Sequence, residues 1–532
     1  MIKKIKTLLL FLTPGIIYSY VLFDLGMKSK DIIRISLGFS LLFFSIVYLV
    51  NKRNNIFFYT IGYVLIIITC INFTITLTNY YYYNSLFNTV SALSILGNNT
   101  REGSEFISNH IYSIYFFILS ILSLTFTAKH TYFKKNKQLN NRFYILILLA
   151  IYFLGYANDR FIKVYDDTAG VYTSIHEAKF LQKSVFYNLS PFLLAYDQNY
   201  FLKMIKGTDT DYGTVSTTSA KNTKLIIVIG ESARRDRHYL YGYKTPNDKL
   251  LNKEDFLIFN NVHSPASQTI TSVPASLTDS SIQSLSVKSL SNNIVNLLKL
   301  ANFDTTWISM QGLTFGRFES FTSAIASYAD RVIDLSSKYD ESSINPINNI
   351  ISTSGKQAIF VHLMGSHPSF ENRYPRERQK PGFALTEDQH YDNSITYTDR
   401  VLSQIIGNSK NHNSIVFYFS DHGLFYNKET QHLKHASVNT TQDIYNIPFF
   451  IWMSESFKQQ NTANISTKNL QSRFNNEDLY FTIKDIMKIS DNKSDESSCL
   501  SLLSECYKEN DNDMVMDLSG KLYKYTSLPK EK

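Results

Sequence analysis

Side chains that can bind a metal ion follow three short apolar segments of the sequence. Each segment is rich in β-branched or aromatic residues, which is typical of a buried strand. The segments and the polar residues after them are Leu225–Ile229 with Glu231, Ala358–Leu363 with His367, and Ile415–Phe419 with Asp421 and His422. Carboxylate and imidazole groups are ligands of zinc and manganese, and zinc usually takes four ligands. The pattern therefore predicts a site for a divalent cation where these strands end.

A segment dense in hydroxyl groups, Ser264–Pro274, follows the apolar run Phe256–Phe259 and has the pattern of a loop that enters a helix. Backbone N–H groups at a helix N-terminus can hold a phosphate group. A bound divalent cation lowers the pKa of a coordinated oxygen, which makes an alkoxide possible at neutral pH. A hydroxyl in this segment is therefore a candidate nucleophile.

The elements that must position these residues form an alternating pattern of strands and helices. Two further predicted strands are Thr305–Met310 and Pro448–Trp452, and two segments with helical spacing are Ile294–Ala301 and Tyr391–Ile406. This alternation predicts an α/β domain with a mainly parallel sheet. In such sheets, sites gather outside the carboxyl ends of the strands.

The N-terminal part of the chain is different, because long apolar runs dominate it. The five runs are Thr7–Phe23, Ile35–Val50, Ile56–Thr78, Ile111–Thr127 and Phe143–Gly155. Basic residues lie before the first run, between the second and third, and between the fourth and fifth, as expected of loops on the cytoplasmic side. Five membrane-spanning helices with a cytoplasmic N-terminus place the rest of the chain outside, which in a bacterial inner membrane is the periplasm.

These patterns predict four parts of the chain. They are a transmembrane domain at 1–158 with an outer loop at 79–110, a membrane-surface connector and linker at 159–222, a periplasmic catalytic domain at 223–490, and a C-terminal extension at 491–532. The outer loop contains four consecutive tyrosines, Tyr80–Tyr83, a run that suits a membrane surface.

Composition limits the possible classes further. The chain has 532 residues, 44% of them hydrophobic, and a formal net charge of +8. Together with the apolar runs, this excludes a simple cytosolic globule, a disordered chain and a pure multi-span channel. No separate basic stripe indicates nucleic acid, and we expect a monomer. Cys499 and Cys506 are close enough in sequence to pair in an oxidising compartment.

Several motifs resemble those of the lipid-linked phosphoethanolamine transferases, which belong to the alkaline-phosphatase/sulfatase superfamily. The matching segments are Val228–Asp236 with Tyr241–Tyr243, Ser267–Pro274, Met364–His367, Ser420–Gly423, His435 ahead of Pro448, and Asn99–Phe106 in the outer loop. The resemblance covers nearly the whole chain in the same order, and it implies a membrane domain followed by a sulfatase-like catalytic domain.

The resemblance also implies roles for individual residues. Glu231, Thr269, Asp421 and His422 would bind one zinc ion, with a second zinc as an alternative and manganese less favoured. Thr269 would be the nucleophile because Pro274 matches the motif proline five residues after it, and Thr271 is the fallback. His367 and His435 would contact the phosphoryl group, a second zinc, or the leaving and accepting oxygens.

Two features depart from the family pattern. Many relatives flank the nucleophile with a disulfide, whereas Pro265 and Ala275 stand where those cysteines would be. The last histidine is ambiguous because His432 precedes His435 by one turn, and we expect His432 to be a surface or supporting residue.

The implied reaction transfers phosphoethanolamine from phosphatidylethanolamine to a cell-envelope acceptor through a covalent intermediate on Thr269. The acceptor would be lipid A, the lipopolysaccharide core or another glycan. Glu102 and Glu105 in the outer loop are candidates to receive the ammonium head group, and His367 and His435 are further substrate-binding candidates.

Three other functions remain open from the sequence. One is a glycerol-phosphate polymerase like lipoteichoic acid synthase, against which the Val228–Tyr243 and Asn99–Phe106 matches argue. The second is a membrane-anchored phosphodiesterase, which differs only in using water as acceptor. The third is an inactive sensor or scaffold, against which the intact set of ligand residues argues.

Overall fold

The computed structural model divides into two compact units, residues 1–198 and 199–532, which we describe separately. It describes residues 15–50, 56–97, 100–130, 183–205, 212–244, 250–286, 288–313, 320–335, 337–379, 386–429, 432–434, 440–461, 466–492 and 499–531.

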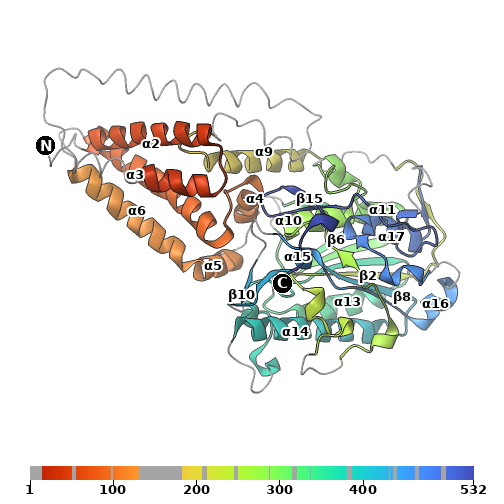
Figure 1. Cartoon of the computed structure of the whole chain (residues 1–532). Helices are drawn as coiled ribbons and strands as arrows, with labels where there is room; N and C mark the ends of the chain where they lie inside the picture. The colour runs from red at the N-terminus through yellow and green to blue at the C-terminus, as the bar shows by residue number, and fades with distance from the viewer. Residues whose placement is uncertain are drawn as a thin grey trace. The chain divides into compact units, whose positions relative to one another are not determined.

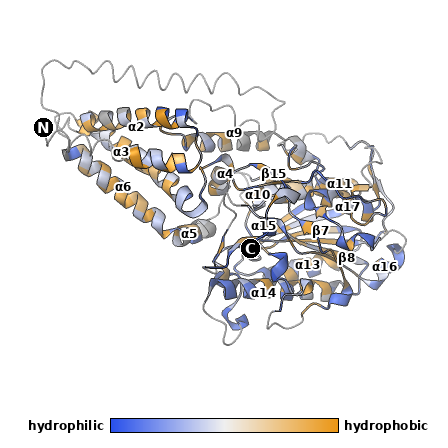
Figure 2. Cartoon of the chain, viewed as in Figure 1, coloured by the Kyte–Doolittle hydropathy of each residue, from blue (hydrophilic) through white to orange (hydrophobic). Residues whose placement is uncertain are grey.

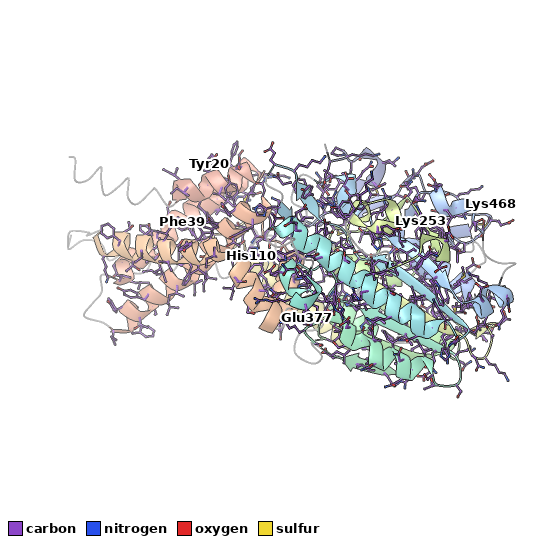
Figure 3. The ribbon with its side chains drawn as sticks, turned by 90° about the horizontal axis from the view of Figure 1, so that it is seen from below. Tyr20, Phe39, His110, Lys253, Glu377 and Lys468 are labelled. Atoms are coloured by element: carbon purple, nitrogen blue, oxygen red, sulfur yellow. A yellow bond between two sulfur atoms is a disulfide. The ribbon has the colours of Figure 1, made fainter. Side chains whose placement is uncertain are left out.

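The first unit is a group of apolar helices. Three of its described helices are long and apolar enough to cross a membrane: α2 (Ser29–Val50), α3 (Ile56–Thr78) with its π-helical extension η1 (Asn79–Tyr83), and α6 (Ile111–His130). Figure 2 shows that hydrophobic residues predominate in these helices. Phe39 is buried between the helices whereas Tyr20 is 63% exposed (Figure 3), so apolar side chains line both the interior and the outside. Such a helix surface suits a lipid environment.

The predicted apolar runs agree with these helices where the structure describes them. The third run has the bounds of α3, and the second and fourth runs lie inside the longer helices α2 and α6. Part of the first run forms a short apolar helix, Gly15–Asp24. The fifth run, Phe143–Gly155, lies outside the described residues. The predicted outer loop contains η1, α4 (Thr89–Gly97) and α5 (Thr100–Asn109).

The second unit is built on a seven-stranded sheet with the order β3-β11-β8-β2-β7-β5-β6. The strands are β2 (Lys224–Gly230), β3 (Phe256–Ile258), β5 (Asp304–Ser309), β6 (Arg331–Asp334), β7 (Gln357–His362), β8 (Ser414–Ser420) and β11 (Phe449–Met453). The five strands from β8 to β6 are parallel, whereas β11 runs antiparallel to both of its neighbours. The predicted α/β domain with a mainly parallel sheet is confirmed.

Helices cover both faces of this sheet, which explains why its central strands are apolar throughout. Figure 1 shows α13 (Ile344–Ile351) and α14 (Glu387–Ser409) on one side, and α11 (Ile294–Leu300) and α17 (Leu479–Ile486) on the other. Every residue of β2, β7 and β8 is buried. The register places Ile229 beside both His362 and Phe419, so the carboxyl ends of these three strands lie level.

Two smaller features involve the parts that the sequence predicted as linker and extension. Ser216 and Thr217, within the predicted linker, form a short strand β1 that pairs with β13 (Ile489–Ser490). Cys499 and Cys506 form a disulfide in the C-terminal extension.

Acidic side chains gather in the interior next to helix α10 (Thr269–Leu277). Burial and the neighbouring Asp478 raise the pKa of Glu477 to about 8, although Glu477 accepts a hydrogen bond from the Ile282 N–H at 2.7 Å. A carboxyl whose pKa is higher in the folded state than in the unfolded state makes the fold less stable as the pH rises between the two values. Glu477 therefore destabilises the fold progressively between about pH 4.5 and pH 8.

We predict that Glu477→Gln raises the thermal midpoint at pH 8 by roughly 2–6 °C and changes it little at pH 4.5, because the amide does not ionise. Both tryptophans, Trp307 and Trp452, are buried in the sheet, so tryptophan fluorescence reports on this unit. Glu455→Gln, at a 79% exposed side chain, is the matched control. An equal midpoint for Glu477→Gln and the unmodified protein at pH 8 would contradict the prediction.

Candidate functional site

Three of the predicted metal-binding residues meet at the carboxyl edge of the sheet. Glu231 follows β2, and Asp421 and His422 follow β8. One ligand atom from each of the three lies within 4.8 Å of the other two. All three side chains are at most 1% exposed, so the group sits in the protein interior.

The chain makes tight turns to bring these residues together. Ser232 adopts a left-handed conformation with φ of 57°, and its N–H donates to Oδ1 of Asp421 at 3.0 Å. Gly365, with φ of 47°, packs directly on the backbone of Glu231, where an added Cβ would lie 2.8 Å from the Glu231 nitrogen. Only glycine combines this conformation with such close contact at little cost. The turn after β7 is thereby pressed against the turn after β2.

The carboxylate of Glu231 receives two hydrogen bonds on Oε2. The Oγ1 of Thr269 donates at 2.9 Å, and the Nε2 of Gln311 donates at 3.0 Å. The same Gln311 nitrogen contacts the Leu363 carbonyl at 2.9 Å, which fixes its position between β5 and β7. Gln311 was not predicted as a site residue. The available signal was its place directly after the predicted strand Thr305–Met310.

Thr269 and its alternative Thr271 have different surroundings. Thr269 is the first residue of α10, and its Oγ1 also lies 3.4 Å from Nε2 of His422. Thr271 is buried, and its hydroxyl donates to the Gln268 carbonyl at 3.3 Å. Of these two hydroxyls, the structure brings that of Thr269 to Glu231 and His422.

His422 has a defined orientation. Its Nδ1 lies 2.7 Å from the carbonyl oxygen of Gly423, so Nδ1–H donates there and Nε2 is the nitrogen beside the carboxylates. Nε2 lies 3.5 Å from Oε1 of Glu231 and 3.5 Å from Oδ2 of Asp421. Burial lowers the pKa of His422, but the carboxylates of Asp421 and Glu231 outweigh it and raise this pKa above its ordinary value. The surroundings of Nε2 therefore favour a positive charge.

The three residues fit a divalent cation. Within the described part of the chain, the buried Oδ2 of Asp421 has no hydrogen-bond partner, although buried polar atoms are normally paired. Two carboxylates and one imidazole are a ligand set that zinc accepts, and the Thr269 hydroxyl adds a fourth oxygen at the same place. A cation there would offset the repulsion between the two buried carboxylates.

His367 lies in the turn after β7. Asp340 holds this turn by accepting the N–H groups of Met364 and Gly365, each at 2.9 Å. Burial lowers the pKa of His367 to about 4, and the nearby Glu231 carboxylate offsets part of this effect. The imidazole is therefore neutral at neutral pH and close enough to Glu231 to be affected by its charge.

The remaining predicted residues are placed elsewhere or not described. His435 lies outside the described residues. His432 lies on β10 (His432–Lys434), is exposed, and pairs through Nδ1 with Glu387 at 2.7 Å. Glu102 and Glu105 lie on α5 of the first unit.

The site combines a buried carboxylate–imidazole group, beyond the carboxyl edge of a mainly parallel sheet, with a hydroxyl at a helix N-terminus. This combination is typical of metal-dependent phosphoryl- and sulfuryl-transfer enzymes. Residues 223–489 match the sulfatase family, and the chain belongs to that family. The predicted membership of the alkaline-phosphatase/sulfatase superfamily is confirmed.

Curated relatives extend over most of the chain. The chain is 29% identical over 399 residues to the putative transferase YhbX of Escherichia coli (strain K12). This alignment covers 73% of this chain and 72% of the relative. It is 26% identical over 515 residues to the phosphoethanolamine transferase EptC of the same organism. This alignment covers 88% of this chain and 86% of the relative.

Solved structures show the same fold. The integral membrane protein EptA, a lipooligosaccharide phosphoethanolamine transferase from Neisseria meningitidis, aligns with a TM-score of 0.61 at 18% identity and covers 94% of this chain and 96% of its own. The periplasmic domain of EptC from Escherichia coli in complex with zinc aligns with a TM-score of 0.53 at 24% identity. This alignment covers 60% of this chain and 98% of the EptC domain. A helical membrane domain followed by a sulfatase-like domain, as predicted, is confirmed.

We predict that His422→Ala weakens zinc binding by more than about 100-fold, because it removes the nitrogen of a buried ligand set. His432→Ala is the matched control, and it should bind zinc as tightly as the unmodified protein, because the His432 side chain faces Glu387. Calorimetric titration of the metal-free protein with zinc, with bound metal counted by mass spectrometry, measures both. Wild-type affinity in His422→Ala would contradict the assignment.

Proposed function

We propose that the chain transfers phosphoethanolamine from phosphatidylethanolamine to an acceptor in the cell envelope, such as lipid A, the lipopolysaccharide core or another glycan. The observation that carries the proposal is the position of Thr269 at the start of α10, with its hydroxyl 2.9 Å from Glu231 inside a buried carboxylate–imidazole group. The proposal is supported by the relatives named as phosphoethanolamine transferases, of which EptC covers 88% of the chain.

The reaction has two halves with Thr269 as the nucleophile. Its Oγ1 forms a bond to the donor phosphorus, the bond from phosphorus to the diacylglycerol oxygen breaks, and the hydroxyl proton ends on that oxygen. An acceptor hydroxyl or phosphate oxygen then forms a bond to the same phosphorus, the bond from phosphorus to Oγ1 of Thr269 breaks, and the acceptor's proton ends on Oγ1, which restores the threonine. Glu231 orients the hydroxyl by accepting its hydrogen bond, and Gln311 holds the Glu231 carboxylate in place.

Histidines near the reacting oxygens would move the protons. His367 and His435 are our candidates, since a positioned acid or base of this kind contributes roughly 10²–10⁴-fold to a rate. Burial keeps the imidazole of His367 neutral, so a ring nitrogen is available to take a proton from the incoming acceptor group.

Zinc is the cation that we propose for the site, with Glu231, Thr269, Asp421 and His422 as its ligands. When bound, it would supply positive charge that lowers the pKa of a hydroxyl ligand and stabilises the charge on phosphoryl oxygens. A single zinc ion would use all four of these ligands.

A membrane anchor would bring the catalytic domain to its lipid donor. We propose that the helical unit spans the bacterial inner membrane several times with the N-terminus in the cytoplasm, which leaves the catalytic domain in the periplasm as a monomer. The three long apolar helices among its described residues support an anchor in the bilayer. An anchored domain meets membrane lipids at high effective concentration.

A peptide mass map of the purified full-length protein tests the nucleophile. We expect phosphoethanolamine on Thr269, and we expect both this adduct and transfer activity to be lost in Thr269→Ala. Thr271→Ala is the matched control and should keep the adduct, because the Thr271 hydroxyl donates to Gln268. Glycerol phosphate at Thr269 would contradict the proposed donor, and an adduct that persists in Thr269→Ala would contradict the nucleophile.

We further propose that Glu102 and Glu105 of α5 receive the ammonium group of the donor. Glu105→Gln should then raise the KM for phosphatidylethanolamine roughly 5- to 50-fold, the loss of one charge-assisted contact. The measurement is diacylglycerol release against donor concentration in mixed micelles. The proposal fails if Glu105→Gln and Glu102→Gln both leave this KM unchanged.

A further inference from the structure

A hairpin near the C-terminal end of the described chain packs against the catalytic domain. Its strands are β14 (Met514–Met516) and β15 (Leu522–Lys524), which pair antiparallel. Oδ1 of Asp517 closes the turn by accepting the N–H groups of Ser519 at 2.8 Å and Lys521 at 3.0 Å. We call residues 514–531 the C-terminal strap.

The strap forms a β-bridge with the loop that leads to Thr269. The Met516 N–H donates to the Pro265 carbonyl at 2.9 Å, and the Ser267 N–H donates to the Met516 carbonyl at 3.1 Å, around a parallel bridge to Ala266. Both hydrogen bonds lie within four residues of Thr269. The backbone that delivers the Thr269 hydroxyl is therefore fixed by hydrogen bonds from a segment about 250 residues away in sequence.

Tyr525 fixes the beginning of the same loop. Its ring stacks on the buried ring of His263 with centroids 3.8 Å apart and planes 3° from parallel. Its hydroxyl donates to Oδ1 of Asn446 at 2.7 Å, and Asn446 forms an antiparallel bridge with His263. The loop is thus held between the strap and the segment that contains Asn446.

The far end of the strap reaches the turn that follows Glu231. The carboxylate of Glu531 lies 2.9 Å from Nη1 of Arg234, and their side chains are only 8% and 3% exposed. Nη1 of Arg234 also donates to the carbonyl of Leu424, two residues after His422, at 2.7 Å. One ion pair therefore ties the strap to both of the turns that carry the carboxylates and the imidazole.

We propose that the C-terminal strap is a positioning element that holds the Thr269 loop in register with Glu231 and His422. The strap contacts the segments that carry all three residues. The disulfide among the described residues, Cys499–Cys506, lies outside the Thr269 loop, so the loop depends on non-covalent contacts for its position. A nucleophile displaced by about 1 Å can lose about 100-fold in rate, which makes this support matter for turnover.

The kinetic part of this inference rests on the proposed function. Two measurements on the full-length protein in detergent test the inference. The first is hydrogen–deuterium exchange of peptides that contain the Ser267 amide, which donates to the Met516 carbonyl. The second is kcat and KM for diacylglycerol release from phosphatidylethanolamine. The variants are Tyr525→Leu, which removes the ring stack, and Glu531→Gln, which removes the ion pair.

We expect faster exchange at Ser267, a kcat lowered roughly 10- to 100-fold, and a donor KM within about twofold of the unmodified protein. Tyr525→Phe, which keeps the ring stack, should restore most of the kcat. The matched control is Glu505→Gln, at an 81% exposed side chain outside the strap. This control should behave like the unmodified protein.

The tryptophan fluorescence transition shows whether each variant is folded. The inference is overturned if folded variants keep the wild-type exchange rate at Ser267. Fast exchange with an unchanged kcat would also overturn it, because the loop would then move without consequence for turnover. If the unmodified protein releases no diacylglycerol, the proposed function fails, while the exchange readout still decides whether the strap holds the loop.

Discussion

Two carboxylates, Glu231 and Asp421, lie beside one imidazole in the protein interior, and much of the α/β domain serves to hold them there. Ionised carboxylates in a low-dielectric interior are unfavourable unless a counter-charge and hydrogen bonds accompany them. The protein supplies the hydrogen bonds: the N–H groups of Ser232 and His422 donate to Oδ1 of Asp421, and Thr269 and Gln311 donate to Glu231. The remaining requirement is a positive charge, which a zinc ion between these ligands would meet.

Much of the surrounding structure can be understood as support for this arrangement. The parallel register brings the ends of β2, β7 and β8 to one level, so the residues that follow them meet without long loops. Tyr391 on α14 donates its hydroxyl to the Ser232 carbonyl at 2.7 Å and accepts the Arg234 N–H at 2.8 Å, which stabilises the left-handed turn. Asp340 supports the turn before His367 in the same way. Each support comes from an element remote in sequence, so the geometry depends on the whole fold.

The fold could be predicted largely from sequence because its signals are local. Runs of β-branched and aromatic residues mark buried strands, and long apolar runs mark candidate membrane helices. The supports could not be predicted in this way. Gln311, Asp340 and the strap residue Met516 are ordinary polar or apolar residues in their local sequence, and their roles arise from hydrogen bonds to partners 24 to 251 residues away. Such contacts are set by tertiary packing, which a single sequence does not display.

By itself, the sequence determined which residue types stand at the strand ends and that a hydroxyl-rich loop enters a helix nearby. Tertiary structure decided which of these residues meet. Successive helical residues are rotated by about 100°, so Thr269 and Thr271 point in different directions, and the placement of α10 brings the Thr269 hydroxyl to Glu231. Similarly, His432 pairs with Glu387, and the Gly423 carbonyl sets which nitrogen of His422 faces the carboxylates. Residue identity fixes the available chemistry, but direction and distance exist only once the elements have packed.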